Sequence, residues 1–473
     1  MMRRIAMPGI AIFVLFLALE AGVQAQSRFA YVADNGSGSV SAYTINPATG
    51  ALMIAPGSPL PSGADPFSIA LDPFNRFVYV GNGTAGPAGI WAFKVNSATG
   101  SLTLVPGSPF PAPDPGNAYN LSVDPSGRFL FAANGTFAEG SVSAFTIDAR
   151  TGALTAIPGS PFPTGGQQSV GAVVHPNGRF LYVENIFTSN VSAFSIDPNT
   201  GILSLIPGSP FASGSTPNGI AMDPLGRFLI TANFDFPPGS QGGVSVFKID
   251  TNSGALSNVP GSPFSTSGMN SSSAAVDATG QFVYVGNQGS ATVDGFSLNG
   301  ATGFLTPVPG SPFATGNTPL SLSAEPAGMF LYEVGEGANA VYGYSIDPAT
   351  GTLIPVPGSP FGGVTGPWSI ATGATNFCLR DNQSNNLLQF NPATGAYRFT
   401  RCSDGLSLSG TGQVESVSGV VTLTDTQPGY RIRASFNPGQ STGSANIVLV
   451  VSQGVFETIR INDTNPNSVC SCT

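Results

Sequence analysis

The sequence predicts an all-β protein, a seven-bladed β-propeller followed by a small C-terminal β-sandwich or barrel. The motif PGSP recurs seven times, at intervals of 48 to 53 residues, a period typical of solenoids and propellers. Each repeat also carries an Arg-Phe step, or a close variant, that opens an apolar run. Of 473 residues, 41% are hydrophobic, 9% are charged, 61 are Gly and 41 are Pro. This composition favours short strands and tight turns over long helices.

Residues 1–25 have the pattern of a signal peptide. Arg3 and Arg4 precede the apolar run Gly9–Leu19, and small residues stand at Val23–Ala25, where a signal peptidase would cut. No later apolar run approaches the roughly 20 residues needed to cross a bilayer. We therefore expect an exported protein without a membrane span, either periplasmic or extracellular.

Residues 26–375 divide into repeats of four strand-like segments. In the second repeat these are residues 76–80, 89–95, 101–105 and 119–124, in the order RFVYV, GIWAFKV, SLTLV and YNLSVD. A four-stranded antiparallel unit of this length is typical of a propeller blade. The first repeat lacks its innermost strand. Because PWSIATG near the end of the array resembles PFSIALD in the first repeat, we expect it to supply that strand and close the ring.

The PGSP motif is interpreted as architectural. It follows the third segment of each repeat, which would be the outer edge of a blade. Proline cannot donate to a strand ladder, so it is tolerated at an edge and discourages pairing with another molecule. Glycine then lets the chain turn back toward the centre.

Residues 376–473 are expected to form a separate β domain. The start of this segment echoes half a blade, which raises the alternative of an eighth blade, but no eighth PGSP follows. All four cysteines lie here, and export favours disulfides. Cys470 and Cys472 are too close to pair comfortably with each other. We expect each of them to pair with one of Cys378 and Cys402.

Charge and histidine content exclude several functions. The net charge is −9 and only two lysines are present, Lys94 and Lys248, so there is no basic patch for nucleic acid. No Asp-rich calcium loop appears, and neither a metal nor a cofactor is expected. The one histidine, His175, replaces the Asp of a recurrent Asp-Pro turn. We interpret it as a turn residue, which leaves no base for a Ser-His-Asp triad.

The segment HPNGRFLYVENIFTSNVSAFSIDPNTGIL, residues 175–203, resembles the seven-bladed lactonase family, which includes 6-phosphogluconolactonase and fungal muconate cycloisomerases. The resemblance covers residues 28–373. It implies active residues at one mouth of the central channel: an Arg-His pair and a further His at the start of inner strands, and a Glu just after the Asn that ends the next strand.

Those positions can be located by counting back from the Asp-Pro turn. The residues five before it, with the matching one in the closing strand, are Phe67, Tyr119, Val170, Asn218, Ser272, Leu320 and Trp368. The residues four before it are Ser68, Asn120, Gly171, Gly219, Ser273, Ser321 and Ser369. Neither set contains Arg or His, and of the acidic position only Glu336 remains. Glu184 is expected to point between blades and is a weaker candidate.

An aromatic patch remains at the same mouth. Trp368, Phe67 and Tyr119 occupy equivalent positions in consecutive blades, and Asn120 and Asn218 add polar groups on the same rim. Such a surface suits a neutral sugar or a peptide. The alternative is that the rings fill the wedge between blades.

Two functions are consistent with these residues. The first is a binding or scaffold module that recognises a glycan or a protein partner at the propeller mouth. The second is a lactone hydrolase of the 6-phosphogluconolactonase type with Glu336 as the base, although lactone hydrolysis also needs a group to stabilise the oxyanion and none is evident. The sequence leaves open whether the protein is an enzyme.

Overall fold

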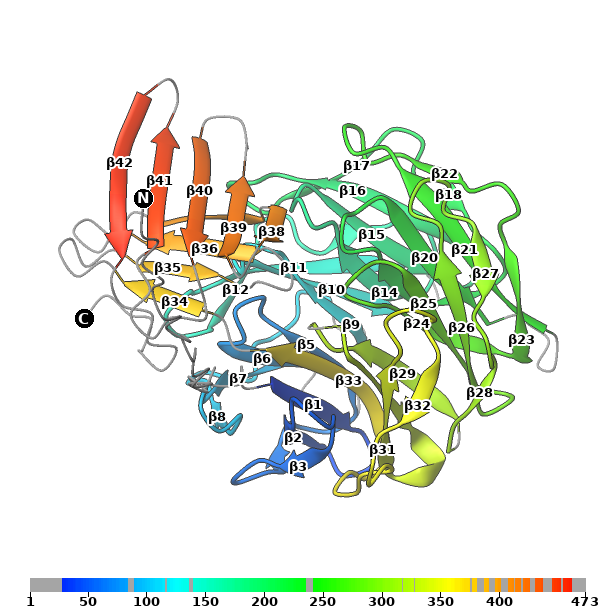
Figure 1. Cartoon of the computed structure of the whole chain (residues 1–473). Helices are drawn as coiled ribbons and strands as arrows, with labels where there is room; N and C mark the ends of the chain where they lie inside the picture. Colours follow the sequence, from blue (N-terminus) through cyan, green and yellow to red (C-terminus); the bar gives the residue numbers. More distant parts are fainter. Residues whose placement is uncertain are drawn as a thin grey trace, which may run out of the picture.

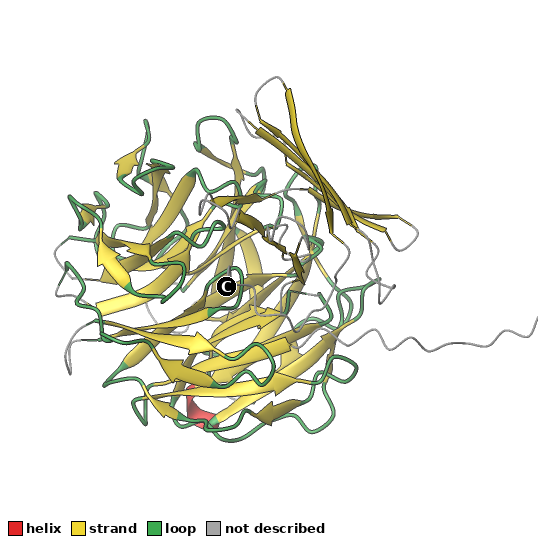
Figure 2. Cartoon of the chain, turned by 90° about the vertical axis from the view of Figure 1, so that its left-hand side faces the viewer, coloured by secondary structure: helices red, strands yellow, loops and turns green. Residues whose placement is uncertain are grey.

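A computed structural model describes residues 28–83, 89–114, 117–135, 139–234, 241–316, 318–326 and 328–374, together with nine strands between residues 377 and 461. Strands and turns make up nearly all of this part of the chain, with the short 3-10 helix η1 (Glu336–Ala338) as the exception (Figure 2). The expected signal peptide lies outside the described residues. Among the residues described, no helix is long and apolar enough to span a membrane.

Seven antiparallel sheets form the blades (Figure 1). The innermost strands are β33 (Pro367–Ala374), β5 (Pro66–Leu71), β9 (Asn117–Val123), β14 (Ser169–Val174), β19 (Pro217–Met222), β24 (Ser271–Val276) and β29 (Pro319–Ala324). The second strands are β1 (Arg28–Asp34), β6 (Phe77–Asn82), β10 (Phe129–Gly135), β15 (Phe180–Asn185), β20 (Phe228–Asn233), β25 (Phe282–Asn287) and β30 (Phe330–Gly335). The third strands are β2 (Ser39–Ile45), β7 (Ile90–Val95), β11 (Ser141–Ile147), β16 (Asn190–Ile196), β21 (Gln241–Ile249), β26 (Thr292–Leu298) and β31 (Ala340–Ile346). The outer strands are β3 (Leu52–Ile54), β8 (Leu102–Leu104), β12 (Leu154–Ala156), β17 (Leu203–Leu205), β22 (Leu256–Asn258), β27 (Leu305–Pro307) and β32 (Leu353–Pro355).

The ring closes where the sequence predicts. β1, in blue, lies beside β33, in yellow (Figure 1), and pairs on its other side with β2, so that Tyr31 stands opposite both Ala42 and Ala371. Each inner strand contacts the inner strand of the next blade, and β33 contacts β5 and β29. The seven-bladed prediction is therefore confirmed. Pairing the last strand with the first removes the open sheet edge that a linear array would expose.

The hydrophobic core lies between neighbouring blades. One cluster joins Phe29 and Tyr31 of the first blade to Val78 and Phe93 of the second, and the cluster at the ring closure includes Tyr332 of the seventh. Five buried tyrosines also donate their hydroxyl groups to the carbonyl of a hairpin glycine in the next blade. The pairs are Tyr31–Gly100, Tyr79–Gly152, Tyr182–Gly254, Tyr284–Gly351 and Tyr332–Gly50, at 2.7 to 3.2 Å.

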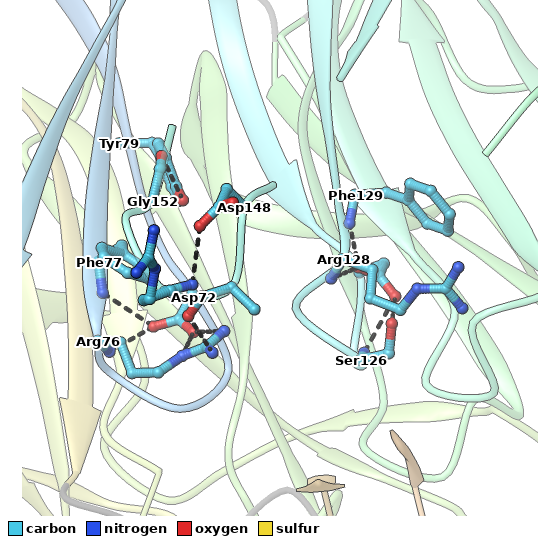
Figure 3. Close-up of polar contacts among 12 residues, drawn as sticks. Asp72, Arg76, Phe77, Tyr79, Ser126, Arg128, Phe129, Asp148 and Gly152 are labelled. Carbon is cyan, nitrogen blue, oxygen red and sulfur yellow. Dashed lines mark hydrogen bonds and ion pairs between the residues drawn. The ribbon is translucent and has the colours of Figure 1, made fainter. Parts of the chain in front are cut away.

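The Asp-Pro turn fixes where each second strand begins. In the second repeat the buried carboxylate of Asp72 accepts hydrogen bonds from the Arg76 Nε at 2.7 Å and the Phe77 backbone N–H at 3.0 Å (Figure 3). Arg76 also donates to the carbonyl of Ala149 in the following blade, at 3.1 Å. In the next turn the carboxylate of Asp124 accepts hydrogen bonds from the backbone N–H groups of Arg128 and Phe129. Because the turn is anchored, residues counted back from it occupy corresponding places in every inner strand.

The PGSP motifs cap the outer edges of the blades. In the second blade, Gly107 has a left-handed φ of +89°, and the following Ser108–Pro109 peptide is cis, as it is in all seven motifs. The Ser108 Oγ accepts a hydrogen bond from the Ala92 backbone N–H at 2.9 Å. In five blades the chain then forms a further strand against the third one, namely β4 (Leu60–Pro61), β13 (Phe162–Pro163), β18 (Phe211–Ala212), β23 (Phe264–Met269) and β28 (Phe313–Ala314). The Ser108 hydroxyl therefore pairs with the Ala92 N–H, a backbone donor that the short outer strand leaves unpaired.

Two more antiparallel sheets follow the propeller. One consists of β34 (Phe377–Arg380), β35 (Leu387–Phe390), β36 (Ala396–Thr400) and β37 (Ser407–Thr411). The other consists of β38 (Gln413–Val417), β39 (Val420–Asp425), β40 (Tyr430–Phe436), β41 (Ala445–Val451) and β42 (Gly454–Ile461). Whether residues 376–473 pack as a sandwich or barrel stays a prediction. So do the disulfides, because the side chains of Cys378, Cys402, Cys470 and Cys472 lie outside the described part of the structure.

Candidate functional site

Every inner strand contains a β-bulge near its start. In β5, Pro66 pairs with Asn82 and Ser68 pairs with Gly81, which leaves Phe67 as the extra residue. The other inner strands shift register at the same place, so the bulged residues are Tyr119, Val170, Asn218, Ser272, Leu320 and Trp368. A bulge re-aims the side chain of the unpaired residue. These seven residues, which we call the bulge ring, are the set that the sequence located five positions before the turn.

Three aromatic members of the bulge ring touch one another. The ring centroid of Phe67 lies 5.3 Å from that of Tyr119 and 5.1 Å from that of Trp368, the latter pair edge-on at 76°. All three side chains are half-buried, whereas the residues that precede them in their strands, Pro66, Ala118 and Pro367, are buried. These three blades therefore present one continuous aromatic surface, which we call the aromatic arc. The rings pack between blades and also keep part of their surface open to solvent.

The residues after the bulges tie the inner strands together. The Asn120 Oδ1 accepts a hydrogen bond from the Ala172 N–H in the next blade at 3.1 Å, and the Ser68 Oγ donates to the Ala118 carbonyl at 3.0 Å. The Ser321 Oγ accepts from the Ile370 N–H at 3.3 Å. These side chains stabilise the channel wall, so Asn120 has a structural contact that sequence reasoning did not assign to it.

The bulge ring and the residues that follow it carry no charge. The seven bulge residues and the seven that follow them are aromatic, aliphatic, amide, hydroxyl or glycine residues, with no Lys, Arg, His, Asp or Glu among them. Asn218 is the one amide in the bulge ring and is half-buried. Glu336 begins η1, directly after β30, but its side chain lies outside the described residues. The structure therefore gives no geometry for Glu336 as a base.

Glu184 is a buried acid at the level of this ring. It pairs with Gly171 across β14 and β15, its side chain has no exposed surface, and a Cβ on Gly171 would collide with its Oε2. Neither carboxyl oxygen has a hydrogen-bond partner of normal geometry. Burial raises the pKa of Glu184 well above its usual range, and the Gly219 backbone N–H in the next blade offsets only part of this rise.

His175 lies away from this mouth, in its turn. Its Nε2 is 2.9 Å from the Gly226 carbonyl and its Nδ1 accepts a hydrogen bond from the Asn177 N–H at 3.0 Å. Because Nδ1 accepts, the ring proton must be on Nε2, which donates to the carbonyl. Burial lowers the pKa of His175. The residue is a neutral turn residue with both nitrogens engaged, as the sequence indicated.

Comparison with known proteins identifies the family. The chain matches the family described as Lactonase, 7-bladed beta-propeller over residues 20–117, 157–269 and 240–362, which together make up more than half of its length. It belongs to this family. Members are expected to have Arg and His at the inner strands, and the lactonase-family chain described here has none in the two rings of residues that line this mouth. It matches no sequence among the curated proteins.

Solved structures share the propeller. A protein assigned as a 6-phosphogluconolactonase from Bacteroides uniformis aligns with a TM-score of 0.60 at 18% identity, over 74% of this chain and 100% of that one. A protein with the same assignment from Bacteroides fragilis aligns with a TM-score of 0.58 at 20% identity, over 74% of this chain and 99% of that one. The periplasmic gluconolactonase of Pseudomonas aeruginosa aligns with a TM-score of 0.58 at 20% identity, over 73% of this chain and 98% of that one. At these identities the likeness shows the fold, and the uncovered quarter of this chain is about as long as residues 1–27 and 375–473 together.

Proposed function

We propose that this lactonase-family propeller is exported and binds an uncharged, polyhydroxylated ligand, a carbohydrate, at the aromatic arc. The observation that carries the proposal is the contact of Phe67 with Trp368 and Tyr119, in a ring of bulge residues that has no charged side chain. The C–H faces of a sugar ring pack well on aromatic faces, while nearby amide and hydroxyl groups take its hydroxyls. Half-buried rings suit this role because they are already held in place by their neighbours and lose little freedom on binding.

The same mouth is a poor site for a phosphorylated sugar. Phosphate recognition uses Arg or Lys at hydrogen-bonding distance or backbone N–H groups at a helix N-terminus. The ring positions hold no cation. The predicted export of the chain also favours an extracellular sugar over an intracellular phosphosugar. A neutral saccharide or aldonolactone is the ligand class that these groups support.

A second candidate is hydrolysis of an unphosphorylated lactone, and family membership favours it. One solved neighbour is named a periplasmic gluconolactonase. Against it, attack on a lactone needs a base for water and a donor for the oxyanion, and the two ring sets offer neither an Arg nor a His. The two candidates share the site and differ in whether the bound lactone turns over.

The test uses the protein's two tryptophans as reporters. In a Trp91→Phe background, Trp368 is the only tryptophan, and its fluorescence should change on titration with cellobiose, maltotriose or glucono-1,5-lactone. Calorimetry on the unmodified chain supplies the affinities. Replacing Phe67 by Ala removes the central ring of the arc, and we expect at least a tenfold loss of affinity, since buried aromatic anchors are commonly worth about 2 kcal/mol or more. No binding of any probe, or equal binding by Phe67→Ala, would contradict the proposal.

Turnover is measured in the same samples. Loss of glucono-1,5-lactone above the spontaneous rate, abolished by Phe67→Ala and by Glu336→Gln, would establish the second candidate instead. Binding without turnover supports a binding module. 6-Phosphogluconate serves as the charged comparison and is expected to bind more weakly than any neutral probe that binds.

A further inference from the structure

One blade departs from the others in its second strand, at the position that pairs with the residue after the bulge. Six of the seven equivalent positions hold a residue with a small or β-branched apolar side chain, or glycine, and these are Ala33, Gly81, Ala133, Ala232, Gly286 and Val334. The seventh is Glu184. A propeller with sevenfold repetition supplies its own comparison, and the comparison shows that this place in a blade does not need a carboxyl group.

The surroundings of Glu184 make room for it. Gly171, opposite it in β14, has no side chain, and a Cβ there would meet both Glu184 and the Ile220 Cγ2 of the next blade, the latter at 3.0 Å. The corresponding residue of β19 is Gly219, whose backbone N–H is near the carboxyl group. In other blades a side chain such as that of Ser68 or Asn120 bridges this place. The carboxyl group therefore occupies the channel wall between β14 and β19, at the level of the inner strands.

Folding does not explain why the carboxyl is there. Both oxygens are buried and without a normal hydrogen-bond partner, and a buried, unsatisfied polar group destabilises a protein. In the second blade the same two positions hold Ser68 and Gly81, and the Ser68 hydroxyl is hydrogen-bonded to the Ala118 carbonyl. Ser in place of Gly171 with Gly in place of Glu184 would thus fill the space without an unpaired polar atom. Acids whose pKa is shifted by burial cluster at functional sites, and an unpaired buried polar group calls for an explanation.

We propose that Glu184 is a ligand-binding residue of the channel, and that its carboxyl group hydrogen-bonds a hydroxyl of the carbohydrate that lies on the aromatic arc. The inference rests on the proposed function. The arc spans the blades of Trp368, Phe67 and Tyr119. Along the ring, the wall between β9 and β14 follows the arc, and the wall after that one, between β14 and β19, contains Glu184. A sugar ring stacked on the arc would direct its edge hydroxyls toward this wall.

The protonation state matches a hydroxyl partner. The influences on the pKa of Glu184 are burial, which raises it, and the Gly219 N–H, which lowers it, and no charged side chain is among them. Burial therefore favours the protonated, uncharged form of this carboxyl group, which donates one hydrogen bond and accepts another. A sugar hydroxyl does the same. The carboxyl group is buried, so binding requires a local movement of β14 and β19, whose pairing is already interrupted at Val170 and Asn218.

The test compares three variants with the unmodified chain. Glu184→Ala places here the residue found in three other blades, and Glu184→Gln keeps the shape of the neutral acid. Glu333→Val is the matched control, because Glu333 is also a buried acid of a second strand, with a Tyr344 hydroxyl 3.5 Å from its Oε2, and Val stands at its position in four other blades. Binding of cellobiose and glucono-1,5-lactone is measured by calorimetry at pH 5 to 9, and stability by urea unfolding at pH 4.5 and 8.

We expect Glu184→Ala to weaken binding at least tenfold while its unfolding midpoint at pH 8 is equal to or above that of the unmodified chain. Glu184→Gln should weaken binding less and remove the decline of binding with rising pH, and Glu333→Val should bind normally. Normal binding by Glu184→Ala would overturn the inference. If the unmodified chain binds neither probe, the proposed function fails, and the inference that rests on it fails with it. The urea midpoints bear separately on the role of Glu184 in folding: a lower midpoint for Glu184→Ala at pH 8 assigns it a structural role and overturns the inference even where the probes bind.

Discussion

Asp34 provides a measurable test of how the burial of an acid changes the pH dependence of this propeller's stability. It ends β1, where five other blades have an asparagine, as at Asn82 and Asn185. The side chain is buried. Its Oδ2 accepts hydrogen bonds from the Ser41 Oγ at 2.6 Å and the Ser39 Oγ at 3.4 Å, and the Thr365 backbone also hydrogen-bonds the carboxyl group. Burial raises the pKa of Asp34 from 3.8 to about 7 against the opposing effect of these bonds. The folded protein therefore holds a proton here that the unfolded chain releases.

The consequence for stability has a definite sign. Because the folded pKa lies above the unfolded one, the favourable contribution is complete below about pH 4 and is lost as the pH rises through about 7. A difference of about 3 pKa units corresponds to at most about 4 kcal/mol of unfolding free energy over that range. Asn cannot ionise, so Asp34→Asn should remove this pH dependence. We expect the variant to match the unmodified chain at pH 4.5 and to exceed it by a few kcal/mol at pH 8.

Urea unfolding followed by fluorescence at pH 4.5, 6 and 8 measures the effect. The matched control is Asp148→Asn, at an exposed hairpin turn where three blades have Asn, such as Asn46 and Asn96. There, hydrogen bonds from the Thr151 backbone lower the pKa of Asp148, so its contribution is present at neutral pH and lost as the pH falls. Asp148→Asn should therefore gain nothing at pH 8. An Asp34→Asn variant with the pH dependence of the unmodified chain would refute the reasoning.

Two further substitutions test the geometry of the blades. Tyr332→Phe removes the 2.7 Å hydrogen bond to the Gly50 carbonyl across the ring closure. We expect it to lower the free energy of unfolding in urea by about 1 to 2 kcal/mol. Tyr182→Phe removes the equivalent bond inside the ring, and a smaller loss for Tyr332→Phe than for Tyr182→Phe would show that the bond at the closure contributes less to stability. Gly171→Ala should lower the free energy of unfolding by about 1 to 3 kcal/mol, because the added methyl group collides with Glu184. In a double-mutant cycle, Glu184→Ala should recover most of this loss. Additive losses in that cycle would mean that Glu184 is not the obstacle.

The repeats made the fold readable from the sequence. PGSP, the Arg-Phe step and the Asp-Pro turn, or close variants of them, recur in the same order along the array. The structure shows why for the turn: Asp72 fixes the start of a strand through Arg76 and Phe77. Ring closure was predictable because the last strand repeats the sequence of its counterparts. The arrangement of residues 376–473 was less so, since this segment has no internal repeat against which a strand boundary could be checked.

The bulges were not predicted, although the residues in them were. Phe67, Val170 and Ser272 share no chemistry that marks a bulge. A weak signal exists in the Pro that precedes the bulged residue in four strands, as at Pro66 and Pro217, because proline within a sheet is confined to edges, strand starts and bulges. The unpartnered state of Glu184 could not be foreseen either. It depends on Gly219, which is 35 positions away in the sequence and belongs to the next blade.

Departures from the repeat are the informative residues in a molecule of this kind. Where blades agree, as with the tyrosine–glycine bonds, a shared structural need explains the residue. Where one blade departs, the other blades show that the fold tolerates the ordinary residue, so the exception requires another cause. Three such exceptions are the buried acids Asp34, Glu184 and Glu333, each with a pKa raised by burial. Asp34 and Glu333 receive hydroxyl hydrogen bonds inside the protein, whereas Glu184 has none, and the propeller channel is where we expect its partner to bind.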